Sequence, residues 1–530
     1  MSRSLPSVLA ILGGTLLAAA ALLLLPIFER AGSVEKVAPD TDASEPEAPA
    51  RAREPRPTPA PVLLEGRPFP RPPDPAPPLP EPRRSVFVSP EAAAEGDGTR
   101  MLPRRDLQAA LETLLPGDRL VLMPGAYDGP ISVGETCRDG AEDSPIQVVA
   151  ENGDVLRAQN DGPVLTVARG FWIFQGIAIE PGRSTSFSGV HLAPAAHDVV
   201  YQLGRLRGGK GPGIGVATGA RRIRISSCDI SHFRGGGAKA SHGIQVNSKV
   251  HELTIAANTI HDNQGCGVFV AGPRGKGKGM GSFIEKLAII GNTFHGDGMH
   301  GVKIRGGSRE VRIADNRFWD YRPFRNSRGA AILLYPNIRD TVVEGNFIAD
   351  SSIGVHLGTT EPGTGVTLLG PRGIGILRNY FECGGLARSV AISVNSGTDL
   401  RIHNNVIDRC ADGLDVRALP PAGSFSIANN LFLSPGLAFA LADPAVIELF
   451  GHNLVAAEPR GARARVQGKL RDVAGYAADG RSPAAAVRGP LALSRRDLAS
   501  LAGKDVVDRG RSFDEEPFLG VAPDIGVVER

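Results

Sequence analysis

One short phrase of alternating hydrophobic and polar positions recurs along the middle of the chain. It reads hydrophobic–x–hydrophobic–x–x–Asn–x–hydrophobic, as in LTIAANTI from residue 253 and VRIADNRF from residue 311. Its asparagines recur about 23 to 34 residues apart, and insertions above a constant floor are typical of a coiled repeat that tolerates loops. The asparagines are Asn258, Asn292, Asn316, Asn346, Asn379, Asn405 and Asn430, with Asn453 as a weaker eighth.

Each repeat also contains a second phrase, Gly–hydrophobic–x–hydrophobic, as in HGIQVNS from residue 242 and HGVKIRG from residue 300. Alternation with a period of two places one side chain inside and the next outside. Stacked short strands about 4.8 Å apart therefore predict an all-β parallel solenoid of about ten or eleven rungs. Asparagine suits the turn because it tolerates the left-handed conformation and bonds to neighbouring rungs. The expected inward residues are Ile244, Val268, Val302, Ile332, Val355, Ile392 and Leu414.

The first 85 residues differ from the repeats. Residues 8–28 are almost uninterruptedly apolar and follow Arg3, so they are long enough to cross about 30 Å of hydrocarbon. We interpret residues 1–33 as a signal anchor or a signal peptide, and either one exports the rest of the chain. Residues 34–85 are rich in proline and predict a disordered, semi-rigid linker. The β-helix is expected over 86–456 and an irregular tail over 457–530.

Composition narrows the possible partners and the redox chemistry. With 42% hydrophobic and 22% charged residues the chain is not wholly disordered, and a net charge of +3 over 530 residues gives no nucleic-acid footprint. Five cysteines are too few for a disulfide scaffold. Adjacent rungs would nevertheless bring Cys383 and Cys410 within disulfide range, whereas Cys228 is expected to be a small buried residue.

Several segments carry a family resemblance. VFVSPEAAAEGDGT, LQAALETLLPGDRLVLMPGAYDGPI and FWIFQGIAI resemble the start of right-handed parallel β-helix proteins of the pectate-lyase-like superfamily. More narrowly, they and the terminal VVDRG and PDIGVVE resemble the group that contains chondroitinase B and alginate lyases. The resemblance implies a right-handed β-helix whose amino-terminal end is capped by an amphipathic helix. The residues that fit this helix are Leu107, Leu111, Leu114 and Leu115. The fold alone does not specify an activity.

The outward positions of the second phrase should form two columns along the solenoid. The first column is His191, Gly215, Gln245, Phe269, Lys303, Leu333, His356, Ser393 and Asp415. The second column is Ala193, Ala217, Asn247, Ala271, Arg305, Tyr335, Gly358, Asn395 and Arg417. Insertions with basic residues at 271–286 and 319–329 are expected to wall a cleft over the Lys303 rung. Such a cleft suits an acidic polysaccharide that contains uronate, although an ordinary polar strand surface is the alternative.

For β-elimination an enzyme needs a carboxylate clamp, a base and an acid. We assign these roles to Arg305, Lys303 and Tyr335, respectively. The residues expected to bind substrate are Gln245, Asn247, His300, His356, Asn395 and Arg417. The catalytic residues of chondroitinase-B-like lyases are not transferred, because their Lys and Arg occupy successive rungs of one column and Ala271 precedes Arg305 here.

Other chemistries have weaker signals. Asp412 and Asp415 could supply the paired carboxylates of a hydrolase, but we interpret this spacing as chance. The histidines at 242, 261, 295 and 300 are interpreted as turn residues, with a metal or acid–base cluster as the alternative. No metal ligand and no cofactor is assigned. The chain is thus predicted to act on, or bind, an acidic polysaccharide of the envelope or extracellular matrix. The alternative is a non-catalytic carbohydrate-binding or structural cell-surface protein.

Overall fold

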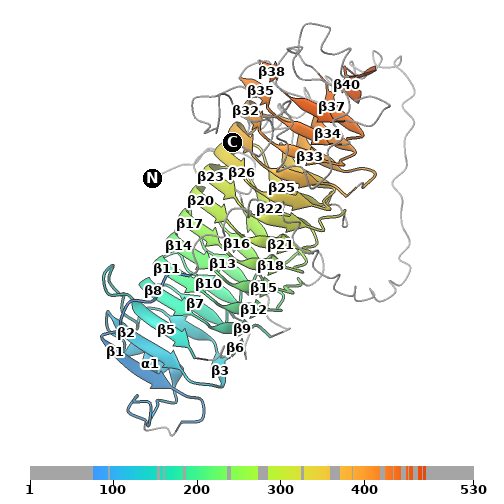
Figure 1. Ribbon diagram of the computed structural model, residues 1–530. Helices are drawn as coiled ribbons and strands as arrows, with labels where there is room; N and C mark the ends of the chain where they lie inside the picture. The colour runs from blue at the N-terminus through green and yellow to red at the C-terminus, as the bar shows by residue number, and fades with distance from the viewer. Residues whose placement is uncertain are drawn as a thin grey trace, which may run out of the picture. The chain divides into compact units, whose positions relative to one another are not determined.

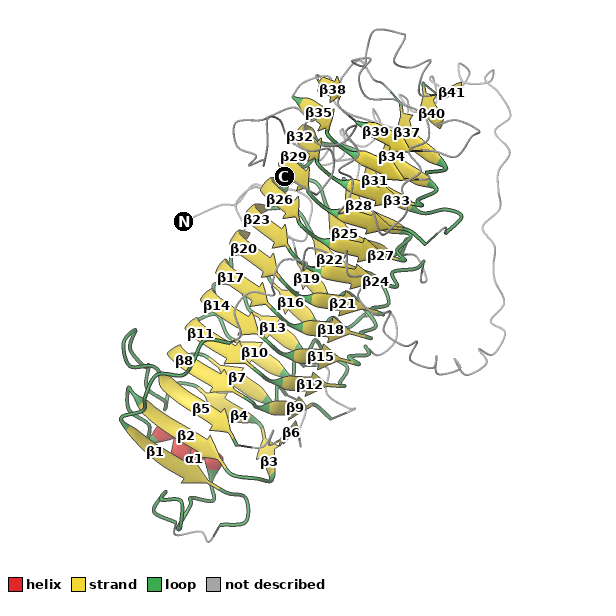
Figure 2. Cartoon of the chain, in the orientation of Figure 1, coloured by secondary structure: helices red, strands yellow, loops and turns green. Residues whose placement is uncertain are grey.

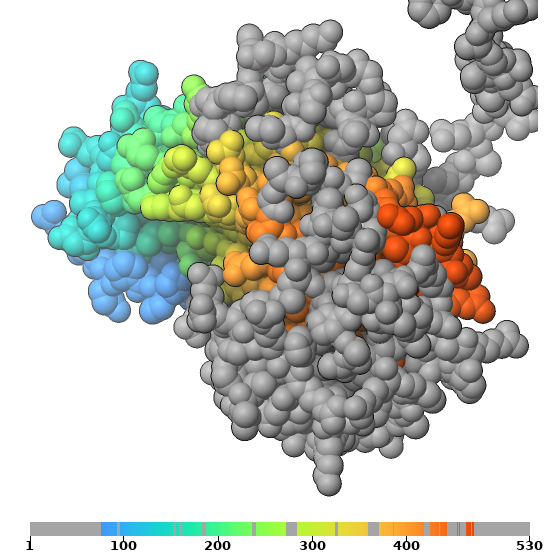
Figure 3. Space-filling model, turned by 90° about the horizontal axis from the view of Figure 1, so that it is seen from above, coloured from blue at the N-terminus to red at the C-terminus, as the bar shows by residue number. Residues whose placement is uncertain are grey.

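The protein forms a parallel β-solenoid (Figure 1). The computed structural model describes residues 76–472 except 93–95, 152–154, 159–161, 183–186, 236–239, 272–283, 324–326, 359–369, 385, 418–423, 434, 443–448, 452, 457–462 and 468. Successive rungs follow one another in sequence order along the solenoid, as the colours of Figure 3 show from above. The predicted apolar segment at residues 8–28, most of the linker and most of the carboxy-terminal tail lie outside the described residues.

Three long sheets run along the described solenoid, and each ordinary rung adds one strand to each sheet (Figure 2). Sheet A contains the strand before each repeated asparagine and has 14 strands. Its strands are β1 (Arg84–Val88), β2 (Asp118–Leu122), β5 (Ile146–Ala150), β8 (Gly170–Gln175), β11 (His197–Gln202), β14 (Arg221–Ser226), β17 (His251–Ala256), β20 (Ile284–Ile290), β23 (Ser308–Ala314), β26 (Arg339–Glu344), β29 (Arg372–Leu377), β32 (Thr398–His403), β35 (Phe425–Ala428) and β38 (Leu449–Gly451).

Sheet B follows the asparagine turn and has 13 strands. Its strands are β3 (Ala126–Gly129), β6 (Val155–Ala158), β9 (Ala178–Glu180), β12 (Arg205–Arg207), β15 (Asp229–Ser231), β18 (Thr259–His261), β21 (Thr293–His295), β24 (Arg317–Trp319), β27 (Phe347–Ala349), β30 (Tyr380–Glu382), β33 (Val406–Asp408), β36 (Leu431–Leu433) and β39 (Leu454–Ala456).

Sheet C contains the Gly–hydrophobic–x–hydrophobic strands and has 14 strands. Its strands are β4 (Ile131–Val133), β7 (Leu165–Val167), β10 (Val190–Leu192), β13 (Ile214–Val216), β16 (Ile244–Val246), β19 (Val268–Val270), β22 (His300–Ile304), β25 (Ala330–Leu334), β28 (Ile353–Leu357), β31 (Val390–Val394), β34 (Asp412–Val416), β37 (Leu437–Leu441), β40 (Arg463–Val466) and β41 (Lys469–Asp472). The last two strands lie beyond residue 456, so the sheet extends further than the sequence predicted, and β41 ends it as an antiparallel partner of β40.

The interior confirms the predicted fold class. All seven residues expected to face inward on sheet C are at most 1% exposed. The predicted asparagines form a continuous buried ladder, in which each side-chain oxygen accepts the backbone N–H of the asparagine one rung earlier. For example, Asn346 Oδ1 accepts from the N–H of Asn316 at 2.9 Å, and the Asn346 side-chain amide donates to Ile313 O at 2.9 Å and to Asn379 Oδ1 at 2.9 Å. The ladder satisfies turn groups that no sheet reaches, which locks neighbouring rungs in register.

One helix, α1 (Leu107–Glu112), lies beside the first strands at the amino-terminal end (Figure 2). The Asp106 side chain caps it by accepting the Ala109 N–H at 2.9 Å. Leu107 and Leu111 are buried, as is Leu114 just beyond the helix, whereas Leu115 is 36% exposed and does not join the apolar face. Its function as a cap for the whole solenoid stays a prediction.

The end of the predicted linker contacts sheet A. The Pro80 carbonyl accepts from Arg119 at 2.8 Å and from the Gln147 side chain at 3.1 Å. The Pro77 carbonyl accepts from Gln202 at 3.3 Å, two rungs beyond Gln147 along the sheet. These contacts place residues 77–80 on the outer face of sheet A, which the proline content alone did not indicate.

The cysteine predictions agree with the structure. Cys383 and Cys410 form a disulfide with a Cα–Cα distance of 4.8 Å, and Cys228 is 2% exposed. Among the described residues, no helix has the length and apolarity that crossing a membrane requires.

Candidate functional site on sheet C

The outer face of sheet C has the two columns expected from the sequence. Strand pairing aligns Phe269 with Lys303 and Lys303 with Leu333, so the first column is in register from rung to rung. The second column lies just beyond the strand ends, where the N–H of Arg305 donates to Val270 O and that of Tyr335 donates to Ile304 O, both at 3.0 Å. Regular pairing therefore brings together side chains that are 30 or more residues apart in sequence.

The three residues assigned to catalysis form one cluster. Lys303 Nζ lies 5.1 Å from the centroid of the Tyr335 ring, and Arg305 Cζ lies 5.3 Å from the same centroid. The Tyr335 ring packs against a small buried group of Ala330, Leu333 and Ile353. An aromatic face attracts cations, so the ring holds two positive charges at one place. Lys303 makes no ion pair with any described residue and remains half-exposed.

Beside this cluster lies a third column of outward side chains, which was not predicted from the sequence. Each of its residues precedes the first-column residue of the same rung by three positions, as His242 precedes Gln245. His242 belongs to it and stacks on Phe269 with ring centroids 4.4 Å apart. The Cys266 N–H donates to His242 Nδ1 at 2.9 Å. Burial, with a smaller effect from Lys303, lowers the pKa of His242 to about 3, so the imidazole is neutral. The sequence signal for this column was Gly243. A Cβ at this position would point into the interior against Ile260, and the side chain of the next residue, Ile244, also points inward, so the alternation of inward and outward residues is interrupted here.

His300, predicted to bind substrate, lies in this third column and is only 5% exposed. Its Nδ1 accepts the Ala330 N–H at 3.2 Å, and its Nε2 lies 3.2 Å from Ser327 Oγ. Burial and then Lys303 lower the pKa of His300 to about 3. The structure thus places His300 beneath the cluster, where it supports β25 and offers a neutral ring rather than a surface contact.

His356, one rung after Tyr335, and Asn395, one rung further along, form a polar pair. The Asn395 side-chain amide donates to His356 Nε2 at 3.3 Å. His356 is 4% exposed, and burial together with Arg328 and Arg417 lowers its pKa to about 4. His356 Nδ1 and Asn395 Oδ1 are buried without a hydrogen-bond partner among the described residues. These polar atoms are available to a ligand that reaches the floor at this rung.

The remaining predicted binding residues lie on sheet C on either side of the cluster, Gln245 and Asn247 before it and Arg417 after it. Gln245 donates to Asn247 at 3.5 Å, a long contact between half-exposed side chains. Arg417 is paired with Asp415 at 2.7 Å. This pairing uses one of the two carboxylates considered for hydrolysis, while burial and the neighbouring Asp415 raise the pKa of Asp412.

The basic walls are only partly described. Most of the 271–286 loop, and Arg325 in the other loop, lie outside the described residues. Arg328 is exposed, and its charge acts on His356. Arg322 is instead paired with Asp320 at 3.1 Å. The enclosed basic cleft therefore stays a prediction.

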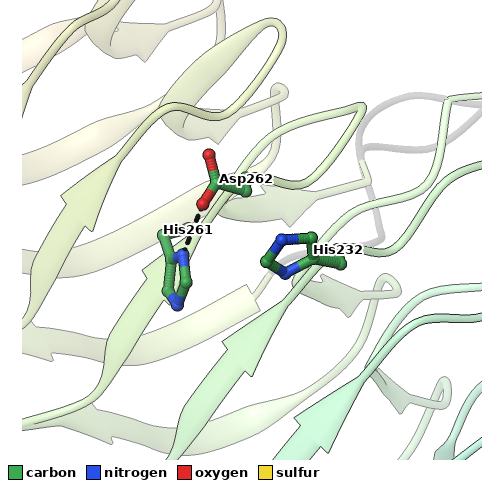
Figure 4. A group of neighbouring side chains, drawn as sticks. All are labelled: His232, His261 and Asp262. Atoms are coloured by element: carbon green, nitrogen blue, oxygen red, sulfur yellow. Dashed lines mark hydrogen bonds and ion pairs between the residues drawn. The ribbon is translucent and has the colours of Figure 1, made fainter. Parts of the chain in front are cut away.

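The four histidines considered as one cluster are divided between two faces. His242 and His300 lie on sheet C, whereas His261 and His295 end β18 and β21 on sheet B, where their rings stack at 4.7 Å. His295 in turn stacks on Trp319 at 4.6 Å. His261 lies near His232 and Asp262, and their possible ligand atoms are all within 4.8 Å of one another (Figure 4).

Sheet A has a separate groove with a volume of about 390 Å³. Glu344 lies in it and pairs with Arg312 at 2.7 Å and Arg378 at 2.6 Å. Because these charges satisfy one another, the groove is a weaker candidate for an anionic ligand than sheet C.

The family comparison agrees with the observed fold. Residues 206–318 and 242–441 match the family model described as "Right handed beta helix region". No curated protein matches the chain. Among solved structures, the pectate lyase Pel9A is 14% identical, with a TM-score of 0.37 over 85% of this chain and 97% of its own. An alginate lyase from Paenibacillus sp. str. FPU-7 is 14% identical, with a TM-score of 0.40 over 63% and 99%.

A third solved structure is the A-module of the mannuronan C-5 epimerase AlgE4 from Azotobacter vinelandii. It is 13% identical, with a TM-score of 0.36 over 64% of this chain and 98% of its own. Likenesses at this level carry no argument about activity.

Proposed function

We propose that this right-handed β-helix protein binds an acidic polysaccharide on the outer face of sheet C and cleaves it by β-elimination next to a uronate. The observation that carries the proposal is the convergence of Lys303 and Arg305 on the Tyr335 ring, at 5.1 and 5.3 Å. Two adjacent cations attract and orient a carboxylate, and the planar guanidinium suits a bidentate contact. The exposed length of a β-helix face also suits an extended polymer.

Each residue of the cluster has one role in this reaction. Arg305 holds the uronate carboxylate and so favours the negative charge that develops when the neighbouring C–H proton leaves. Lys303 takes that proton, and Tyr335 donates its hydroxyl proton to the departing glycosidic oxygen. The C–O bond breaks as a C=C bond forms, which requires no water and no redox partner.

A second candidate function is non-catalytic binding of the same polymer. It is favoured by Ala271, which precedes Arg305 in its column and supplies no second ionisable group there. The full chain incubated with a panel of polyuronates separates the two candidates. Cleavage appears as the ultraviolet absorbance of unsaturated uronates. Retention on an immobilised polyuronate without this absorbance supports binding alone. If the chain gives neither the absorbance nor the retention, both candidate functions are rejected.

We further propose that the solenoid is exported by the apolar segment at residues 8–28. The Cys383–Cys410 disulfide supports this placement, because such bonds persist mainly in oxidising compartments. A fusion of the first 85 residues to alkaline phosphatase should be active in cells if the proposal holds. An inactive fusion that remains in the cytoplasm would reject it.

A further inference from the structure

The turn that follows sheet B contains three side chains of types that can bind a metal ion, separate from the three residues of the Lys303 cluster. His232 comes directly after β15, while His261 ends β18 and Asp262 follows it. Pairing of Ser231 with His261 places the two rungs side by side. Figure 4 shows the Asp262 carboxylate lying above the gap between the two imidazole rings. We propose that His232, His261 and Asp262 bind one divalent transition-metal ion of the zinc type.

His261 is oriented as a metal ligand requires. Its Nε2 lies 3.1 Å from Asp229 Oδ1, and its Nδ1 lies 2.7 Å from Asp262 Oδ2. A metal-ligating histidine typically donates its other ring N–H to a carboxylate, which fixes the tautomer and the ring plane. Here Asp229 provides that carboxylate, and the stacked ring of His295 restrains the plane of His261 from the next rung. Nδ1 is therefore the atom directed at the site.

His232 supplies the second nitrogen ligand. Its Nδ1 is buried and has no hydrogen-bond partner among the described residues, so its ring is not committed to any other contact through that atom. Burial lowers the pKa of His232, opposed by Asp262 and assisted by Arg207, His261 and Arg234, which favours the neutral form that a metal ligand requires.

The backbone holds the ligands in place without a metal. His232 and Asp262 have φ angles of 62° and 54°, so both occupy the left-handed turn position of their rungs. The same position recurs at Asp320 and Asp350 along the solenoid. The repeat itself therefore preorganises the ligands, and ordering them costs little when an ion binds.

The donor set selects the ion. Two imidazole nitrogens with one carboxylate oxygen suit Zn²⁺ and its neighbours, with water in the remaining position, whereas Ca²⁺ and Mg²⁺ prefer oxygen ligands alone. When the ion binds, it replaces the proton shared by His261 Nδ1 and Asp262 Oδ2, and that proton goes to solvent. No electron transfer is involved.

The test is calorimetric titration of the untagged full chain with Zn²⁺ alone, in two buffers that differ in ionisation enthalpy. The expected result is one ion per chain with release of one proton. His232→Ala and Asp262→Asn should each weaken binding at least about tenfold. The control His251→Ala, which removes an exposed histidine paired with Glu285 on sheet A, should leave affinity unchanged.

Thermal unfolding without metal verifies that each variant is folded. If His232→Ala does not fold, the more conservative Asp262→Asn variant still tests the site. Titration with Co²⁺ is an independent readout, because four-coordinate Co²⁺ absorbs visible light. Both variants should show a weaker absorbance than the wild type at the same Co²⁺ concentration. The proposal is overturned if the wild-type chain shows no saturable binding of Zn²⁺, or if a folded Asp262→Asn variant binds Zn²⁺ as tightly as the wild type.

Discussion

Lys303 and Tyr335 lie on adjacent rungs of sheet C, with the Lys303 Nζ 5.1 Å from the centroid of the Tyr335 ring. Arg305 contacts the same ring, so cation–π attraction to one tyrosine offsets part of the repulsion between the two cations. Beneath them, His242 and His300 are buried and neutral, and they add no positive charge to the cluster. The surface cations are thus concentrated over a neutral, rigid floor.

Tyr335→Phe separates the two roles of the tyrosine. The ring and its contacts with Lys303 and Arg305 remain, so polyuronate binding should be unchanged, but the proton donor is lost. Cleavage should fall by about 100-fold or more. Steady-state kinetics and equilibrium binding on the same preparation measure both effects. Full cleavage activity in the folded variant would assign the acid to a different group.

Binding should depend strongly on ionic strength. The screening length shrinks from about 10 Å at 0.1 M salt to about 3 Å at 1 M, so attraction between exposed cations and a polyuronate weakens. We expect affinity for a polyuronate to fall steadily over this range, whereas any affinity for a neutral glucan should not. Equal salt sensitivity of both polymers would show that charge does not select the ligand.

The pH dependence of stability should report on Asp297. Burial raises its pKa to about 8, although Asn263 and Tyr321 donate hydrogen bonds to it. Its folded pKa thus exceeds its ordinary value of 3.8, so the folded state holds a proton that the unfolded state has lost. The stability that Asp297 contributes should therefore be lost as pH rises from about 4 to about 8. Four histidines, whose folded pKa values burial lowers to about 3 or 4, act in the opposite direction below about pH 6.5, so the contribution of Asp297 is measured as a difference between variants.

Asp297→Asn should remove this contribution, because the amide keeps the shape without titrating, so the stability of the variant relative to the wild type should rise between about pH 4 and 8. Urea unfolding at several pH values measures the effect, and Asp128→Asn, at an exposed aspartate on sheet B, is the control. If the free energy of unfolding of Asp297→Asn changes with pH as that of the wild type does, groups other than Asp297 cause the pH dependence.

The asparagine ladder should contribute strongly to stability. Asn346→Ala removes a hydrogen-bond partner from the buried Asn316 N–H, the Asn316 side-chain amide and the Ile313 carbonyl, which all lie on the preceding rung. A loss of about 3 kcal/mol in the free energy of unfolding is expected, at about 1–3 kcal/mol for each buried group left unpaired. Asn247→Ala, a half-exposed control, should cost much less in urea unfolding. Similar losses in both variants would contradict the ladder's role.

The sequence predicted the ladder and the two outward columns because rungs stack in register, so a period of two determines which side chains align. It did not predict the third column, because the chain bends at Gly243 and the residue before it turns outward to stack on Phe269. His300 was expected at the surface for the same reason and is buried instead.

The division of the histidines could not be predicted either. Spacing places His261 and His300 near strand ends, but it does not say which sheet each strand joins. Only the rung geometry brings His261 beside His232 and separates it from His300. Likewise, residues 77–80 contact sheet A through backbone carbonyls, which leave no pattern in the side chains.

The most direct test of the account is the dissociation constant of the full chain for a polyuronate, measured for the wild type and for a variant that combines Lys303→Ala and Arg305→Ala. Arg221→Ala, an exposed arginine on sheet A, is the control for lost charge. Two lost contacts to a charged ligand, each worth about 1.5–3 kcal/mol, predict binding weaker by at least about 100-fold, with the control unchanged. Equal affinity of the folded double variant and the wild type would contradict the account.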